Sequence, residues 1–174
     1  YLINNQKLSF MRNIIDSHTH IGDLNGKTYT KSQLDVFVKS KLPNDDVVEK
    51  MYVSNLDVLT SKKGEYEGNK QLLDNFKNSK EYELFLACSP KDGKVNNIEN
   101  LIKENPNRFI GLKFHPTLQN LDIMDSRYVP YLEFANKNKI PCLFHSAVAL
   151  IDGKINPNVK DISDPESIYK LAKQ

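Results

Sequence analysis

The sequence predicts an α/β protein built on a parallel sheet, and two observations support this fold class. Short apolar runs alternate five times with segments whose apolar residues recur at helical spacing. The run at residues 82–88 is apolar at nearly every position, as expected of a strand that is covered on both faces. The alternation therefore favours parallel strands joined by right-handed helical crossovers.

The first strand is predicted at residues 13–20, where two isoleucines precede a His-x-His pair. Alternate side chains of a strand share a face, so Asp16, His18 and His20 are expected to point to one side. Their Cα atoms then lie roughly 6–7 Å apart, which allows two imidazoles to approach one ion. The opposite face is expected to pack outward and consists of Ile15, Ser17 and Thr19.

The remaining elements follow in order along the chain. A capping box at Thr30 and Gln33 predicts a helix that directs Leu34, Phe37 and Val38 inward. Further helices are predicted at about residues 45–50, and from Asn69, Asn96, Pro130 and Asp164 onward. Further strands are predicted at residues 51–56, 82–88, 109–115 and 140–145. Polar loops are predicted at residues 21–26, 62–68 and 148–163, the last of them long enough to act as a lid.

Two architectures accommodate this alternation, an open doubly wound sheet and a (β/α)8 barrel. The Gly-x-Gly-x-x-Gly fingerprint of a nucleotide-binding fold does not follow the first strand. Polar residues collect instead where the first, fourth and fifth strands end. In barrels this rim is where active sites form.

All four histidines of the chain fall at predicted strand ends. His18 and His20 close the first strand, His115 closes the fourth and His145 closes the fifth. Each alone is more readily explained as a hydrogen-bonded core or strand-end residue, but together they predict a metal or acid–base site. Neutral imidazole is a good zinc ligand, and three protein ligands plus water is the usual catalytic arrangement.

Two charged residues accompany the histidines. Lys113 shares a face with His115, and it either binds a substrate carboxylate or oxyanion or extends past the rim to solvent. Asp16 either orients a ligand histidine or a basic residue, or satisfies polar groups at the base of its strand.

Composition excludes some classes of partner. The 174 residues carry a net charge of +2 with no basic run, so no nucleic-acid partner is expected. No membrane association is expected either, because no segment is apolar and long enough to span a bilayer. Cys88 and Cys142 lie in apolar runs and are predicted to be reduced and buried, which favours a cytoplasmic location.

Three blocks, at residues 14–21, 110–116 and 140–145, resemble the amidohydrolase superfamily, in its amidohydrolase-related or type 2 branch. This branch includes decarboxylases and lactonases. The resemblance implies a (β/α)8 TIM barrel with one divalent ion, usually zinc. On it, His18, His20 and His145 map to metal ligands, whereas Lys113 and His115 map to a position that contacts substrate in many members.

The resemblance implies hydrolysis of a C–N or C–O bond, or non-oxidative decarboxylation, of a small and anionic organic acid. Lactonase-like members without a metal offer a second interpretation, in which the histidines bind substrate and move protons. A third is that the chain is an inactive fragment that serves at most as a binding module. The TatD-like deoxyribonucleases also begin with His-x-His, but they place a glutamate where this chain has Lys113.

Members of the family carry a further histidine after strand six and an aspartate after strand eight, beyond the position of Gln174. A whole barrel needs about 250 residues. Residues 12–174 are therefore expected to be the N-terminal part of a TIM-barrel metal-dependent hydrolase domain, its first five βα units, and residues 1–11 an N-terminal extension. Such a piece leaves two sheet edges open, which a homo-oligomer can cover.

Overall fold

The structure is a computed structural model that describes residues 12–40, 42, 45–146, 150–151, 154–155 and 163–173. The predicted N-terminal extension at residues 1–11 lies outside the described residues, as does most of the predicted lid at 148–163. Two short strands of that loop are described, β7 (Leu150–Ile151) and β8 (Lys154–Ile155), and they pair antiparallel.

One six-stranded sheet organises the chain, with the strand order β2-β1-β3-β4-β5-β6. Its strands are β1 (Asn13–Leu24), β2 (Lys27–Tyr29), β3 (Val47–Asn55), β4 (Tyr82–Ala87), β5 (Phe109–Phe114) and β6 (Cys142–Phe144). The short β2 pairs antiparallel with β1, and every other neighbouring pair is parallel. The predicted α/β class with a largely parallel sheet is confirmed.

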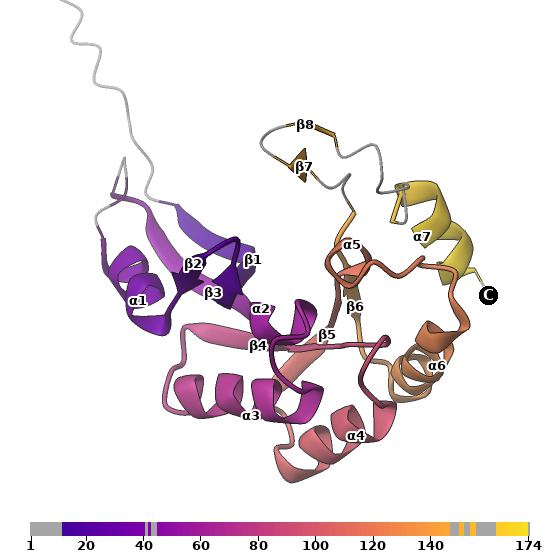
Figure 1. Cartoon of the computed structure of the whole chain (residues 1–174). Coiled ribbons are helices and arrows are strands. Elements are labelled where there is room, and N and C mark those ends of the chain that lie inside the picture. Colours follow the sequence, from indigo (N-terminus) through magenta and orange to yellow (C-terminus); the bar gives the residue numbers. More distant parts are fainter. Residues whose placement is uncertain are drawn as a thin grey trace, which may run out of the picture.

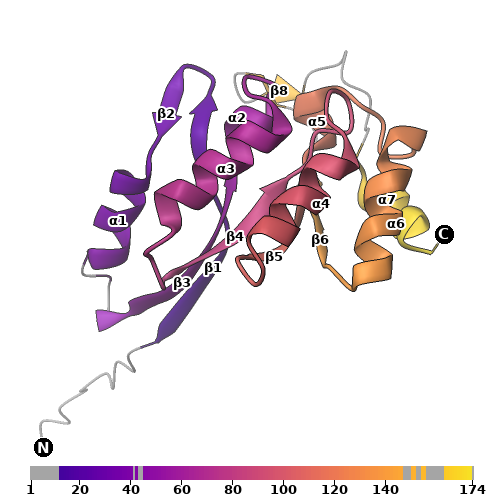
Figure 2. The ribbon, with the colours of Figure 1, turned by 90° about the horizontal axis from the view of Figure 1, so that it is seen from below.

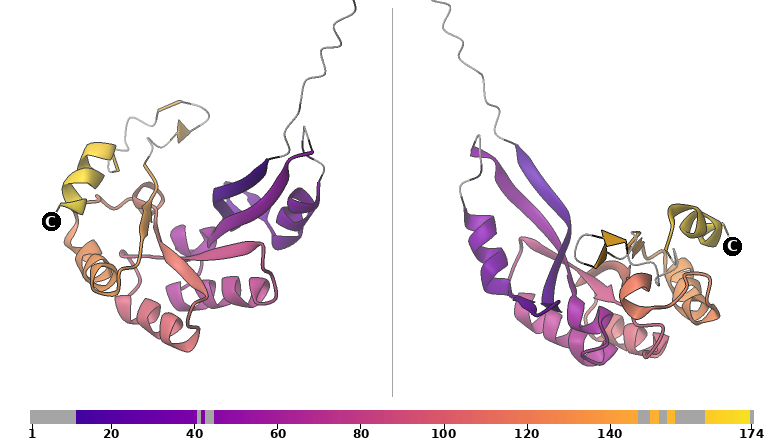
Figure 3. Two further views of the ribbon diagram at one scale, coloured as in Figure 1. Left: turned by 180° about the vertical axis from the view of Figure 1, so that it is seen from behind. Right: turned by 45° about the horizontal axis from the view of Figure 1, so that its top comes forward.

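Helices cover one side of this sheet. The described helices are α1 (Lys31–Lys39), α2 (Leu56–Leu59), α3 (Glu65–Phe76), α4 (Val95–Glu104), α5 (Pro116–Gln119), the 3-10 helix η2 (Ser126–Tyr128), α6 (Val129–Asn138) and α7 (Pro165–Ala172). The sheet is curved, and α1, α3, α4 and α6 lie along its convex side (Figure 1). Seen from below, these helices form a layer in front of the strands (Figure 2). Helix α7 lies beside α6, at the β6 end of the sheet (Figure 3).

The apolar core lies between the convex face and this helical layer. One cluster packs β4 and β5 against α4 and α6, with Leu112 and Phe114 of β5 fully buried. A second cluster packs β3 and β4 against α3, where Phe76 is fully buried. Alternate side chains of a strand point to opposite faces, so Lys113, between Leu112 and Phe114, points to the face away from the helices.

Several predicted elements are confirmed by the structure. Thr30 and Gln33 form the predicted capping box of α1, in which the Thr30 side chain accepts from Gln33 N. Pro130 lies in the first turn of α6, and Asp164 caps α7. The burial predicted for the two cysteines is confirmed for Cys88, whereas Cys142 is only half-buried.

Other predictions are wrong at the first two strands. The predicted helix at residues 45–50 is instead the start of β3, because the β-branched Val47 and Val48 pair with the amino end of β1. The predicted loop at 21–26 is instead a hairpin of β1 and β2. Its turn is Asn25-Gly26, both with positive φ, which is the usual signature of a two-residue hairpin.

The start of α3 and the set of buried side chains in α1 also differ from the predictions. Helix α3 begins at Glu65, inside the predicted loop at 62–68, and Asn69 lies within the helix rather than at its cap. The Asn69 side chain is used in packing, since its Oδ1 accepts from Ala87 N at 2.9 Å. In α1, Leu34 and Val38 pack against the core as expected, but Phe37 is 45% exposed.

No helix among the described residues has the length and apolar character needed to cross a membrane.

Candidate active site

The four histidines lie together at the carboxyl ends of the parallel strands. The ring centroid of His18 lies 4.8 Å from that of His20 and 6.1 Å from that of His145. The His145 ring stacks on His115, with 3.8 Å between centroids and 14° between ring planes. Segments that are far apart in the chain therefore meet, because parallel strands end at one edge of the sheet.

The strand that carries the first two histidines is irregular. The register between β1 and β3 shifts between Asp16 and Thr19, so β1 holds one more residue there than its neighbour. Bulges of this kind re-aim side chains and are frequent beside active sites. The predicted strict alternation from Asp16 to His20 is therefore wrong.

The bulge explains the place of Asp16. Its Oδ1 accepts from the backbone N–H of His18 at 3.0 Å. The carboxylate thus stabilises the irregular backbone rather than orienting an imidazole ring or a basic side chain. The outward packing predicted for Ile15 and Ser17 is also wrong, since Ser17 is exposed and Ile15 is 53% exposed.

His20 is held by a neighbour that the sequence did not single out. Ser54, at the end of β3, pairs with His20 in the register, and its Oγ lies 2.8 Å from His20 Nδ1. Ser54 is 3% exposed. The pairing of β1 with β3 could have revealed this contact, because a polar residue directly opposite a strand-end histidine can reach its ring.

Lys113 lies inside this cluster rather than extending to solvent. Its side chain is fully buried, and its Nζ lies 3.0 Å from His18 Nε2. Burial lowers the pKa of Lys113 to about 8. An ammonium only donates, so Nε2 of His18 accepts in this pair. Of the two roles that the sequence left open for Lys113, the path to solvent is wrong.

His115 caps the short helix α5 with its ring. Its Nδ1 accepts from the Leu118 backbone N–H at 3.2 Å. A neutral imidazole that accepts through Nδ1 carries its proton on Nε2. His115 therefore offers an N–H donor to the site, unlike a ring that offers a lone pair.

The environment keeps these imidazoles neutral. Burial is the main cause in each case, and the positive charges of neighbouring groups add to it. The pKa of His20 is lowered to about 3, that of His145 to about 4 and that of His115 to about 2. The pKa of His18 is also lowered, by burial and then by Lys113. At neutral pH each ring therefore has one nitrogen without a proton, which is the form that metal ligation requires.

The chemistry of this donor set suits a divalent cation, but the side chains as they stand do not enclose one. Among the residues that the structure describes, no three His, Cys, Asp or Glu side chains are arranged to hold a metal ion. One reason is visible at His18, whose Nε2 faces the Lys113 amine. The metal site predicted at His18, His20 and His145 stays a prediction.

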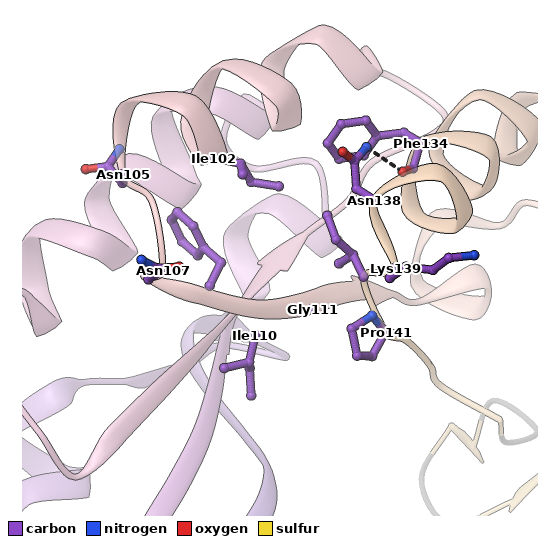
Figure 4. A pocket seen from close by; sticks show the side chains of 11 residues that line it. Ile102, Asn105, Asn107, Ile110, Gly111, Phe134, Asn138, Lys139 and Pro141 are labelled. Carbon is purple, nitrogen blue, oxygen red and sulfur yellow. Dashed lines mark hydrogen bonds between the residues drawn. The ribbon is translucent and has the colours of Figure 1, made fainter.

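A surface hollow of about 380 Å³ lies elsewhere (Figure 4). It is lined by Gly111 of β5, by Pro141 just before β6, and by Asn105 and Asn138 at the ends of α4 and α6. His115 and His145 follow the opposite, carboxyl ends of β5 and β6. This hollow therefore has no part in the histidine cluster.

Comparison of the sequence with protein-family models finds no match, and comparison with curated proteins finds none either. The functional assignment of this chain therefore depends on the geometry of its own residues.

Proposed function

We propose that this chain carries the active site of a metal-dependent, amidohydrolase-type enzyme that acts on a small anionic organic acid. The reaction is hydrolysis of a C–N or C–O bond or non-oxidative decarboxylation. The observation that carries the proposal is the meeting of four neutral imidazoles and one buried lysine at the carboxyl ends of β1, β5 and β6. Lys113 and His115 are buried, and polar or charged groups are costly to bury unless they serve a purpose such as chemistry.

In this proposal His18, His20 and His145 hold one divalent ion, with zinc favoured by an all-imidazole donor set. An ion held by these residues would supply Lewis acidity toward a carbonyl or carboxyl group. His18 contributes its Nε2 only after the Lys113 amine has moved from it, since one lone pair cannot serve both.

Lys113 and His115 act on the substrate. The Lys113 ammonium and the His115 Nε2–H are donors, and both side chains are at least nine-tenths buried. Donors fixed in a site of low polarity stabilise a carboxylate or a developing oxyanion more than they do in water. This pair therefore favours an anionic substrate over a neutral or cationic one.

We extend the proposal to the fold, in which this sheet is part of a (β/α)8 barrel. The parallel strands β1, β3, β4, β5 and β6 are neighbours in chain order. A doubly wound sheet instead reverses its order at the point where ligands bind. The unbroken order and the single helical layer support the barrel.

A metal-independent enzyme is the second candidate, favoured by the 3.0 Å contact between Lys113 Nζ and His18 Nε2. In that enzyme the lysine and the histidines bind substrate and transfer protons directly. The two candidates differ in their response to a chelator, because only the first depends on a bound ion.

Zinc content and turnover of a panel of lactones, N-acyl compounds and small carboxylic acids, measured on matched variants, test the proposal. His145→Ala is expected to lose both zinc and turnover. His115→Ala removes the ring stacked on His145 and is expected to keep zinc but to lose about 100- to 10,000-fold in turnover. Zinc and turnover that persist in both His18→Ala and His145→Ala would refute the proposal, and chelator-resistant turnover would select the metal-independent candidate.

A further inference from the structure

Ser54 is a buried residue at the end of β3, directly opposite His20 of the histidine cluster. It pairs with His20 across β1 and β3, and its hydroxyl oxygen lies 2.8 Å from Nδ1 of that ring. With 3% of its surface exposed, Ser54 leaves little room for water to take its place. A contact of this kind on a ligand histidine sets both the orientation of the ring and the position of its proton.

We propose that Ser54 is a positioning residue that holds His20 in the Nδ1–H tautomer, so that Nε2 presents a lone pair to the cluster. The tautomer is a property of the metal-free protein. Its consequence for metal binding depends on the proposed function.

The contacts of the two ring nitrogens favour one direction for this hydrogen bond. The Ser54 Oγ lies 2.8 Å from Nδ1, and a hydroxyl oxygen accepts a hydrogen bond as well as it donates one. A proton on Nδ1 therefore meets an acceptor, whereas a proton on Nε2 has no hydrogen-bond acceptor among the described residues. The contact thus favours the Nδ1–H tautomer.

The backbone of Ser54 is itself fixed by the next residue. Asn55 caps α2 by accepting from Asp57 N at 2.9 Å, and its Nδ2 donates to Gly68 O at 2.7 Å. Asn55 is 1% exposed. The end of β3 is therefore tied to α2 and α3, so Ser54 cannot follow the ring if the ring turns.

The Nε2 of His20 then keeps a lone pair and has no hydrogen-bond partner among the described residues. The His18 ring lies 4.8 Å from the His20 ring and 6.1 Å from the His145 ring, between centroids. His115 shows the opposite arrangement, because its Nδ1 accepts a backbone N–H and its proton lies on Nε2. Hydrogen bonds outside the cluster thus assign one ring to ligation and another to donation.

The experiment records long-range ¹H–¹⁵N spectra of the histidine rings in the metal-free protein, with His20→Asn to assign His20. Ser54→Thr and Ser54→Val are compared because the two side chains have the same shape and differ only in the hydroxyl. Ser54→Thr is expected to keep the Nδ1–H pattern of the original protein. Ser54→Val is expected to shift His20 to a mixture of tautomers or to the Nε2–H form.

Zinc titration of the same variants measures how the His20 tautomer affects zinc affinity. Ser54→Val is expected to weaken zinc binding by about 10- to 100-fold relative to Ser54→Thr. Ser89→Ala is the matched control, since Ser89 is also 3% exposed at a strand end and its hydroxyl has no hydrogen-bond partner among the described residues. It is expected to change neither the tautomer nor the affinity.

An unchanged His20 tautomer in folded Ser54→Val overturns the inference, as does a change of equal size in Ser89→Ala or Ser54→Thr. If Ser54→Val does not fold, Ser54→Ala replaces it in the same comparison. A protein that shows the expected tautomers but binds no zinc contradicts the proposed function and leaves the role of Ser54 supported.

Discussion

Replacing Lys113 with methionine tests whether the site keeps a buried charge at the expense of stability. The side chain is fully buried, and burial lowers its pKa from 10.5 to about 8. A change of one in pKa corresponds to about 1.4 kcal/mol, so the charged lysine costs the folded, metal-free protein about 3 kcal/mol at neutral pH. Methionine has a similar length and no charge. The variant is therefore expected to raise the free energy of unfolding by about 1–3 kcal/mol.

The gain in the free energy of unfolding of Lys113→Met depends on pH, and the lowered pKa of Lys113 sets the direction of this dependence. The folded-state pKa of Lys113 lies below its ordinary value, so the folded protein loses this proton more readily than the unfolded chain. The cost is full below pH 8 and disappears as the pH rises from about 8 to 10.5. The stability difference between Lys113→Met and the original protein is thus expected to be largest at neutral pH and to vanish in strong base.

Urea unfolding in the presence of a chelator, at neutral pH and in strong base, measures this difference. Lys137→Met, on the exposed side of α6, is the control and is expected to stay within about 0.5 kcal/mol of the original protein. Removing the amine from His18 costs little, because His18 is exposed and water can hydrogen-bond its ring instead. A Lys113→Met protein that is less stable at neutral pH, or a difference that grows with pH, would refute the reasoning.

Two further substitutions probe the scaffold of the site. Glu65→Gln is expected to lower the free energy of unfolding by about 2–4 kcal/mol in urea titration, and an unchanged midpoint would contradict this. Each oxygen of the buried carboxylate accepts from two of its four donors, so an amide NH2 in place of either oxygen would face two donors. Gly111→Ala is expected to cost about 1–3 kcal/mol in thermal unfolding, because a Cβ there would lie 2.5 Å from the Phe85 ring and 2.8 Å from the Pro141 carbonyl oxygen. Unchanged stability would mean that Gly111 is not closely packed against Phe85 and Pro141.

Much of the parallel sheet could be predicted because its signals are local. Apolar runs and caps marked the strands and most helices, and the histidines were conspicuous because each follows such a run. The start of β3 at Val47 was missed because the turn-forming residues before it also suit a helix. The start of α3 at Glu65 was missed because Gly64 provides no side-chain cap and because the Glu65 carboxylate is used by distant donors.

The candidate site was predictable in its members but not in its details. Alternation placed His18 and His20 on one face, yet it could not foresee the bulge that Asp16 stabilises. Burial of Lys113 against His18 depends on how far the sheet curves, which no local pattern records. Ser54 was overlooked because its role comes from strand register, a relation between two segments 34 residues apart.

The central claim is that imidazoles of His18, His20 and His145 bind one divalent ion. X-ray absorption spectroscopy at the zinc edge, on protein loaded with one equivalent of zinc, tests it most directly. The account predicts about three imidazole nitrogens at about 2.0–2.1 Å, without the sulfur shell at about 2.3 Å that Cys88 or Cys142 would give. A protein that takes up no zinc, or whose zinc has one imidazole or none, would contradict it.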